Sequence, residues 1–232
     1  CLMQKKIVGI HQPNYLPWSG YFNKINNSDI FVILDSVDYQ SGNSNSITNR
    51  TKIKTTNGEL FITVPVNKPK SSKLIKDILI DNKQHWKTKH KKAITLSYVK
   101  APFFKYYYPL IECIIDKDFT DLSSMNISLI KEICKVLDIK TEIVLSSSLN
   151  IDSQDKNQRI VDICKVLNCN TYLSGNGGKK YNDENLFNKN GISLEYVSFN
   201  QKQYTQLYGD FIVGISIIDM IFNIGKESVS FI

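Results

Sequence analysis

The first candidate for chemistry is a polar and aromatic stretch near the start of the chain, residues 10–22, which reads IHQPNYLPWSGYF. It contains His11, a side chain whose pKa range suits general acid–base catalysis. Pro13 and Pro17 restrict the backbone, and a stiff loop holds its side chains in fixed positions. We therefore predict that His11 is the catalytic residue. The alternative is a structural histidine that hydrogen-bonds the backbone.

The same stretch offers groups that can bind a substrate. The rings of Tyr15, Trp18 and Tyr21 can stack on a base or a sugar, or can equally cover the core. We assign Gln12, Asn14, Tyr15 and Trp18 to substrate binding.

A glycine-rich segment, SGNGGKKY at residues 174–181, is the strongest signal for anion binding. Glycines lack a Cβ, so backbone N–H groups can converge on a ligand, and two lysines add positive charge. The P-loop spacing is absent, and a flexible surface turn is the alternative. The residues assigned here to substrate binding are Ser174, Gly175, Gly177, Gly178, Lys179 and Tyr181. Ser174 is also a candidate nucleophile, by position only.

Two further places carry candidate binding residues. Arg50, Lys52 and Lys54 alternate along an expected strand and so share one face, which can hold a phosphate or simply face solvent. The basic run KQHWKTKHKK, residues 83–92, can be a solvated face or can attract an anionic partner. We assign Asn49, Arg50, Lys52 and His90 to substrate binding.

Composition excludes several classes of protein. The 232 residues are 42% apolar and 22% charged, as in an ordinary globular protein, and the net charge is +7. No apolar run is long enough for a transmembrane helix, and the first residues lack a signal-peptide core, so we expect a cytoplasmic protein. The five cysteines and three histidines show no zinc spacing, so we expect reduced cysteines and no metal site.

The expected elements place these residues. Strands are expected at residues 7–10 and 29–34, with a helix at 20–26 between them, and Asp35 and Asp38 follow the second strand. Asn57-Gly58 predicts a β-hairpin, and Pro65 suggests an edge strand. Helices are expected between residues 86 and 138, broken at Pro102 and Pro109, then at 155–167 and 216–225.

A near-repeat supports a parallel sheet. The sequence EICKVLD at residues 132–138 recurs as DICKVLN at 162–168, by duplication or by coincidence, and each copy precedes a short apolar segment. Helix followed by buried strand, twice, is typical of an α/β fold. We predict one domain, residues 1–232, with a mainly parallel sheet, Rossmann-like strand–helix units, an inserted hairpin (47–66) and an inserted helical segment (84–138). Ligands in such sheets bind beyond the carboxyl ends of the strands, which is where His11, Asp35 and Ser174 fall, so we also assign Asp35 to substrate binding.

Taken together, the motifs resemble the WbqC-like protein family. The resemblance rests on HQPNYLPWSGYFNKI, DIFVILDSVDY, NRTKIK, LFITVPV, HWKTKHKKAI, YVKAPFF, YLSGNGGKKY and SIIDMIFNIG, which follow in order along nearly the whole chain.

The resemblance implies a role in bacterial O-antigen or other surface-polysaccharide biosynthesis, including lipopolysaccharide. Combined with the site residues, it suggests a transferase that adds an acyl or aminoacyl group to a nucleotide-linked amino sugar. The donor would be coenzyme A, a carrier protein or tRNA; no cofactor is firmly implied. One alternative is an ATP-dependent nucleotidylyltransferase or ligase, since strand, Pro-rich loop and helix resemble the first unit of HxGH enzymes, although Trp18-Ser19-Gly20-Tyr21 lacks their histidines. The other is a non-catalytic nucleotide-sugar binding protein.

Overall fold

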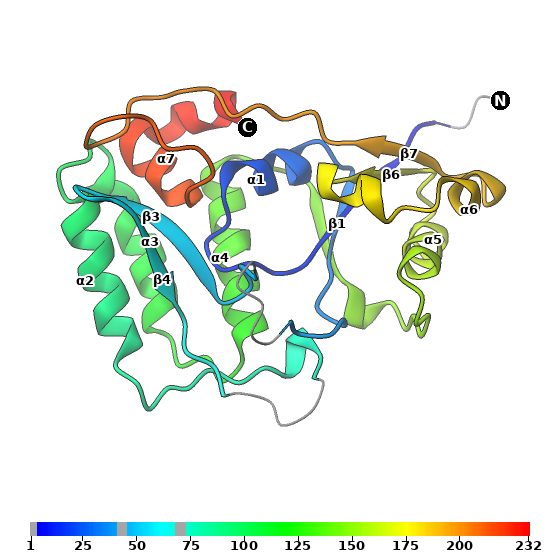
Figure 1. Cartoon of the computed structure of the whole chain (residues 1–232), viewed down its shortest axis with the longest axis horizontal. Helices are drawn as coiled ribbons and strands as arrows, with labels where there is room; N and C mark the ends of the chain where they lie inside the picture. Colours follow the sequence, from blue (N-terminus) through cyan, green and yellow to red (C-terminus); the bar gives the residue numbers. More distant parts are fainter. Residues whose placement is uncertain (1–3, 41–45, 68–72) are drawn as a thin grey trace. The chain divides into compact units, whose positions relative to one another are not determined.

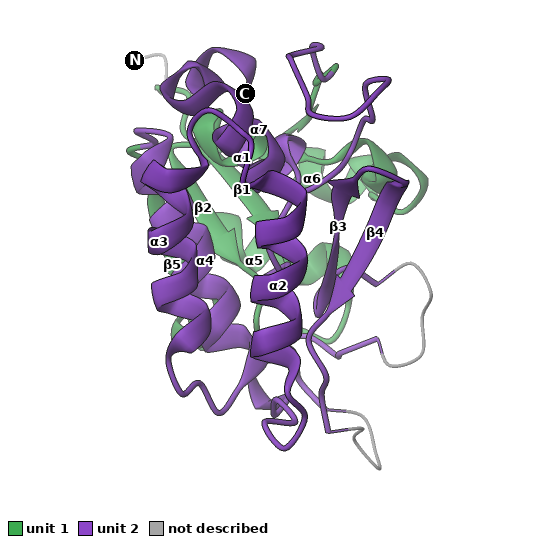
Figure 2. Ribbon diagram, turned by 90° about the vertical axis from the view of Figure 1, so that its left-hand side faces the viewer, with its two compact units in different colours: residues 1–12, 23–36, 140–200 green, residues 13–22, 37–139, 201–232 purple. Residues whose placement is uncertain are grey.

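The computed structural model describes residues 4–40, 46–67 and 73–232, so residues 41–45 of the polar stretch before the hairpin lie outside it. The chain forms two compact units, drawn in separate colours in Figure 2. Unit 1 comprises residues 1–12, 23–36 and 140–200, and unit 2 comprises residues 13–22, 37–139 and 201–232. Helix α1 (Ser19–Asn26) begins in unit 2 and ends in unit 1. The single domain expected from the sequence stays a prediction.

Unit 1 is built on a five-stranded sheet in the order β5-β2-β1-β6-β7, and every neighbouring pair is parallel. This confirms the predicted α/β class with a mainly parallel sheet. Strands β1, β6 and β7 of this sheet are labelled in Figure 1. The strands are β1 (Ile7–His11), β2 (Ile30–Ile33), β5 (Glu142–Leu145), β6 (Thr171–Ser174) and β7 (Ser193–Tyr196).

The core of unit 1 lies between this sheet and two helices, α5 (Lys156–Val166) and α6 (Glu184–Lys189). Strand β2 is buried along its whole length, as its continuous apolar sequence requires in a parallel sheet. Helix α6 and strand β7 were not foreseen. In β7, polar Ser193 and Glu195 alternate with Leu194 and Tyr196, as suits a strand at the edge of a sheet.

Unit 2 contains a separate antiparallel hairpin and a group of helices. The hairpin pairs β3 (Arg50–Thr55) with β4 (Gly58–Thr63), and Gly58 takes the positive φ of 99° that its turn demands. The α-helices are α2 (Trp86–Tyr98), α3 (Phe104–Asp116), α4 (Leu122–Val136) and α7 (Ile217–Ile224), with 3₁₀ turns η1 (Ile75–Asp77) and η4 (Gly225–Phe231). Helix α2 packs on β3 and α3, and α3 packs on α4 and α7.

Pro109 does not break the helical region, contrary to the sequence-based expectation, and lies inside α3. Proline lacks the N–H that would bond the carbonyl of Lys105, four residues earlier. Lys105 is exposed, so water can bond that carbonyl in its place and the helix continues. Pro102 lies between α2 and α3, as expected.

The two copies of the near-repeat end in the same way. Asp138 (φ 52°) and Asn168 (φ 53°) both adopt the left-handed conformation that Asp and Asn tolerate better than other non-glycine residues. In each copy the following residue donates its N–H to the cysteine carbonyl five residues back, over 2.9 Å to Cys134 and 2.8 Å to Cys164. This is the hydrogen bond that closes a helix C-terminus, so the repeated sequence encodes a repeated helix stop.

Candidate functional site

The sheet order creates a switch point between β1 and β6 in unit 1. The chain passes from β1 to β2 on one side, while β6 lies against the other side of β1. Loops that leave such a pair diverge and open a crevice at the carboxyl ends, where ligands bind in α/β sheets. His11 ends β1 and Ser174 ends β6, so both lie at this edge, as the sequence predicted.

His11 is partly buried, and its Nδ1 lies 3.2 Å from the backbone carbonyl oxygen of Gln12. A carbonyl only accepts, so Nδ1 carries the proton in the neutral ring and the basic lone pair is on Nε2. The pKa of His11 is lowered to about 4: burial is the largest cause, the nearby charge of Lys24 also lowers it, and the hydrogen bond to Gln12 opposes both. His11 is therefore neutral at physiological pH.

Lys24 is a candidate that the sequence analysis missed. It lies on the half of α1 that belongs to unit 1, is 4% exposed, and donates from Nζ to the carbonyl oxygen of Ile10 over 2.6 Å. Its Nζ is also 5.9 Å from the centre of the Tyr172 ring. Burial lowers the pKa of this amine to about 7. One sequence signal could have indicated this burial: Lys24 is surrounded by apolar residues of the same helix. Tyr21, Phe22 and Ile25 are all buried.

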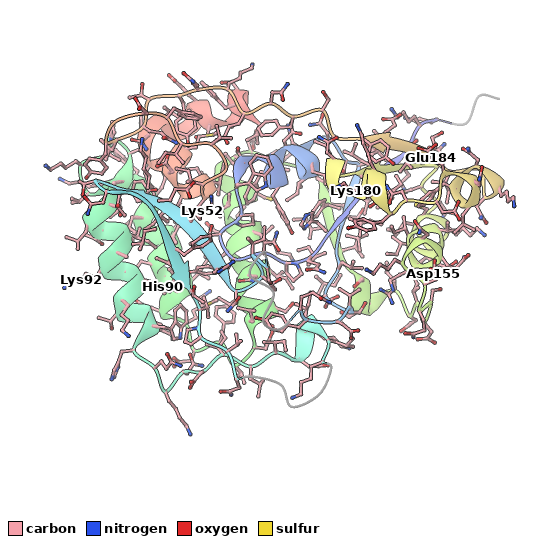
Figure 3. The ribbon with its side chains drawn as sticks, viewed as in Figure 1. Lys52, His90, Lys92, Asp155, Lys180 and Glu184 are labelled. Carbon is pink, nitrogen blue, oxygen red and sulfur yellow. The ribbon has the colours of Figure 1, made fainter. Side chains whose placement is uncertain are left out.

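The glycine-rich segment forms a 3₁₀ turn, η3 (Asn176–Lys180), with Lys180 at its end (Figure 3). A Cβ on Gly175 or Gly177 would meet no atom within 4 Å, but one on Gly178 would lie 2.3 Å from the Ser174 hydroxyl. The N–H groups of Gly178, Tyr181 and Asn182 bond carbonyls within the turn itself. Gly178 is therefore required by packing, and the predicted phosphate cradle has fewer donors to offer than the sequence suggested.

The other predicted residues at this edge differ in exposure. Lys179 places Nζ 5.2 Å from the ring centre of Tyr196, while Tyr181 is 75% exposed. Asp35 is buried and accepts from the Ser146 hydroxyl (2.9 Å), the Ser147 N–H (2.9 Å) and the Ser147 hydroxyl (2.6 Å). With its carboxylate so occupied, Asp35 holds the segment after β5 against the segment after β2.

Unit 2 holds a cavity of about 310 Å³ that collects five of the predicted substrate-binding residues. The residues that define its chemistry are Asn14, Tyr15, Trp18, Arg50, Lys52 and Phe61. Arg50 is held by a bond from Nε to the carbonyl oxygen of Ser46 (3.0 Å), and its guanidinium lies 4.5 Å from the centre of the Phe61 ring. Lys52, labelled in Figure 3, forms a salt bridge with Glu59. Phe61 lies on β4, and no motif in the sequence indicated a site residue on that strand.

Two predicted residues in unit 2 have structural contacts instead. Asn49 donates its amide N–H to the carbonyl oxygen of Val64 over 2.9 Å, which ties the residue before β3 to the residue after β4. His90, on α2 (Figure 3), is 4% exposed and bonds on both sides, to the Tyr15 hydroxyl and to the Thr63 carbonyl oxygen, each over 3.0 Å.

Lys54 is not open to a phosphate or to solvent on the face that it was predicted to share with Arg50 and Lys52. It is 2% exposed, and its Nζ bonds Gln206 and the backbone carbonyl of Asp210. The segment around residue 210 covers that end of the hairpin, which strand alternation alone does not reveal.

The basic run on α2 is partly neutralised. Lys87 pairs with Asp118, and Lys91 pairs with Asp116 and Glu112. A larger recess of about 610 Å³ lies beside it, but none of the predicted site residues lines it. These ion pairs favour the solvated-face interpretation of the run.

The described residues offer neither a metal site nor a membrane-spanning helix. No group of three or more His, Cys, Asp or Glu side chains there is placed to hold a metal ion. Within the same residues, no helix has both the length and the apolar character to cross a bilayer. The four described cysteines are unpaired, and burial raises the pKa of the Cys134 and Cys164 thiols to about 12, which makes both inert.

Comparison with known proteins decides the family. The model of the WbqC-like protein family matches residues 12–231. The chain is a member of the WbqC-like family. This WbqC-like chain is 34% identical over 227 residues to "Uncharacterized protein Rv1507c" of Mycobacterium tuberculosis, and the match covers 96% of each chain. No solved structure matches. All predicted site residues except His11 lie inside the range matched by the WbqC-like model, and His11 precedes it by one residue.

Proposed function

We propose that this protein transfers an acyl or aminoacyl group to the amino group of a nucleotide-linked amino sugar, as a cytoplasmic step in bacterial surface-polysaccharide (O-antigen) biosynthesis. The observation that supports it is the pair of nitrogen bases, His11 and Lys24, at the switch-point edge of the unit 1 sheet. Burial lowers the pKa of each below its ordinary value, so neither is locked in its charged form at physiological pH.

Amide formation requires a base in this position. A sugar amine is protonated in water and must lose a proton before its nitrogen can attack a carbonyl carbon. The new C–N bond forms as the bond from that carbon to the donor breaks, at sulfur in a thioester or at oxygen in an aminoacyl ester. The ammonium form of the sugar gives its first proton to solvent. As the neutral amine attacks, Nε2 of neutral His11 takes the second proton from the nitrogen, which becomes acidic as the new C–N bond forms, and passes it to the leaving sulfur or oxygen. An imidazolium with a pKa near 4, beside a lysine, gives up that proton readily.

The test is a transfer assay with the full chain. Nucleotide-linked amino sugars are incubated with coenzyme A thioesters, acylated carrier protein or aminoacyl-tRNA, and mass spectrometry looks for the sugar gaining the acyl mass. We expect a product with one donor class and no consumption of ATP. Product formed only with ATP hydrolysis would instead support a nucleotidylyltransferase or ligase. The absence of turnover with every donor and with ATP would leave a binding protein and defeat the proposal.

His11→Asn distinguishes a catalytic histidine from a structural one. Asparagine keeps a hydrogen-bonding group but cannot titrate, so we expect turnover to fall roughly 10²–10⁴-fold. The melting temperature should stay near that of the wild type. The matched control is His85→Asn, the same change at an exposed histidine, which should leave turnover unchanged. A His11→Asn protein with normal stability and normal turnover would remove His11 from the mechanism.

A further inference from the structure

The cavity of unit 2 contains a buried donor with nothing to bond. Asn14 lines this cavity and is 2% exposed, and its Nδ2 has no hydrogen-bond partner. Leaving a buried amide nitrogen without an acceptor is unfavourable, so such groups are rare in folded proteins. A ligand that brings an acceptor oxygen or nitrogen into the cavity would satisfy this atom.

The charged residues that line the cavity indicate a negatively charged ligand. Arg50 and Lys52 line it, and none of the described residues that line it is acidic. Lys52 is shared with Glu59, so Arg50 is the stronger anchor. Its guanidinium is fixed by the Ser46 carbonyl and the Phe61 ring, and a planar, oriented guanidinium suits bidentate binding of a phosphate.

The hydroxyl groups at the cavity are already engaged within unit 2. Thr51 donates to the carbonyl oxygen of Leu16 over 2.9 Å, and the Tyr15 hydroxyl bonds His90. The polar groups left for a ligand are therefore the donors of Asn14, Arg50 and Lys52. They match a ligand that is anionic and rich in acceptors.

The aromatic wall indicates a flat group on the same ligand. Trp18 is partly exposed, and Phe61 is 47% exposed although it lies in a cavity wall beside two cations. Rings of this kind stack on a planar base, and a volume of about 310 Å³ is near the lower end for small-molecule sites. We infer that this cavity is a nucleotide-binding site, in which Arg50 meets phosphate, the aromatic wall meets the base, and the Asn14 amide donates to an acceptor on the nucleotide.

This inference needs no transfer reaction and would hold for a protein that only binds nucleotides. It also moves the predicted phosphate contact from the glycine-rich turn of unit 1 to Arg50 of unit 2. Binding is measured without any acyl donor, so failure of the inference and failure of the proposed transferase are separate results.

The test is isothermal titration calorimetry on the full chain with the diphosphates of uridine, cytidine, adenosine and guanosine, with the free nucleosides, and with pyrophosphate. We expect at least one nucleoside diphosphate to bind, and both its nucleoside and pyrophosphate to bind at least tenfold more weakly. Pyrophosphate that binds as well as the nucleotides would reduce the cavity to a simple anion site and overturn the inference. The same follows if none of the four diphosphates binds.

Variants locate the site. Asn14→Leu keeps the shape of the side chain but removes the unpartnered donor, so stability should be kept while nucleotide affinity falls at least tenfold. Arg50→Ala should lower affinity similarly and reduce the salt dependence of binding. Lys92→Ala, on the exposed face of α2 (Figure 3), removes the same charge outside the cavity and should change nothing. If Asn14→Leu fails to fold, the nucleotide affinity of Arg50→Ala is the deciding measurement. Wild-type affinity in the folded variants would place the nucleotide outside this cavity. So would a loss of affinity that occurs only in Gly177→Val, a change in the glycine-rich turn of unit 1.

Discussion

The hydroxyl of Tyr15 lies 3.0 Å from Nδ1 of His90, and Nε2 of His90 lies 3.0 Å from the carbonyl oxygen of Thr63. A carbonyl accepts, so Nε2 carries the proton of the neutral ring, and Nδ1 must accept from the tyrosine hydroxyl. Protonation of Nδ1 would break that bond in a buried place, and burial lowers the pKa of His90 to about 4. His90 thus fixes the ring of Tyr15, which lines the proposed nucleotide cavity.

The first prediction follows from this pKa. The unfolded chain takes up a proton at His90 near pH 6.5, while the folded protein resists it until about pH 4. The stabilisation is therefore complete above pH 6.5 and is lost as the pH falls toward 4, by about 3 kcal/mol at most. Urea unfolding at pH 7.0 and 4.5 should show a smaller pH effect for His90→Gln than for the wild type. His85→Gln, at an exposed histidine, should keep the wild-type effect. Equal effects in all three proteins would contradict the assignment.

A second prediction concerns the influence of Lys24 on His11. Removing the lysine charge in Lys24→Met should raise the pKa of His11 from about 4 toward 6.5 without reaching it, because burial is the larger cause of the shift. NMR titration of the three histidine rings, assigned with single His→Asn variants, measures this directly. Lys180→Met removes an exposed lysine and should leave the pKa of His11 unchanged. An unchanged His11 pKa in Lys24→Met would show that the two groups do not interact.

The third prediction separates two neighbouring glycines of the turn after β6. Gly178→Ala puts a Cβ 2.3 Å from the Ser174 hydroxyl and should destabilise the protein by about 1–3 kcal/mol. Gly177→Val adds a larger side chain into open space and should change stability by less than about 0.5 kcal/mol. Urea midpoints give both values.

The same Gly177→Val protein also tests phosphate binding at the turn. With the nucleotide bound in the unit 2 cavity, its affinity should equal that of the wild type. A tenfold loss, about 1.4 kcal/mol, would return the phosphate to the glycine-rich turn.

A fourth prediction concerns Asp35. Asp35→Asn replaces a carboxylate oxygen with an amide nitrogen that faces the donors of Ser146 and Ser147, so the free energy of unfolding should fall by about 1–3 kcal/mol. Asp38→Asn makes the same change at an exposed position three residues later and should cost less than about 0.5 kcal/mol. Comparable stability of the two variants would argue against a structural role for the Asp35 carboxylate and would favour its predicted role in substrate binding.

Much of the fold was predictable because short stretches of sequence determine the local structure. The apolar run of β2 marks a strand covered on both faces, Asn57-Gly58 marks the hairpin, and Gly225 with φ 57° ends α7 as a C-cap residue should. Pro109 shows the limit of such reasoning. Its effect depends on whether the carbonyl of Lys105 can reach water, and that is a property of the packed helix.

The candidate site was predictable in its position and less so in its contacts. Strand ends point to His11 and Ser174, because parallel strands deliver their carboxyl ends to one edge. A lysine in a helix is ordinarily solvated, so the burial of Lys24 emerges only from its tertiary contact with the carbonyl oxygen of Ile10 in β1. The roles of His90 and Asp35 likewise depend on partners far along the chain, Thr63 and Ser146, which no local pattern identifies.

The course of the chain through its two units has a consequence for synthesis. The chain passes from one unit to the other after residues 12, 22, 36, 139 and 200, so no single cut in the gene releases either unit intact. β1, the central strand of the unit 1 sheet, leaves the ribosome before the other strands of that sheet, yet its second neighbour β6 ends only at Ser174. Until β6 has been synthesised, the nascent chain carries an apolar strand with one edge unpaired. Only then can β6 pair with β1 and close that edge.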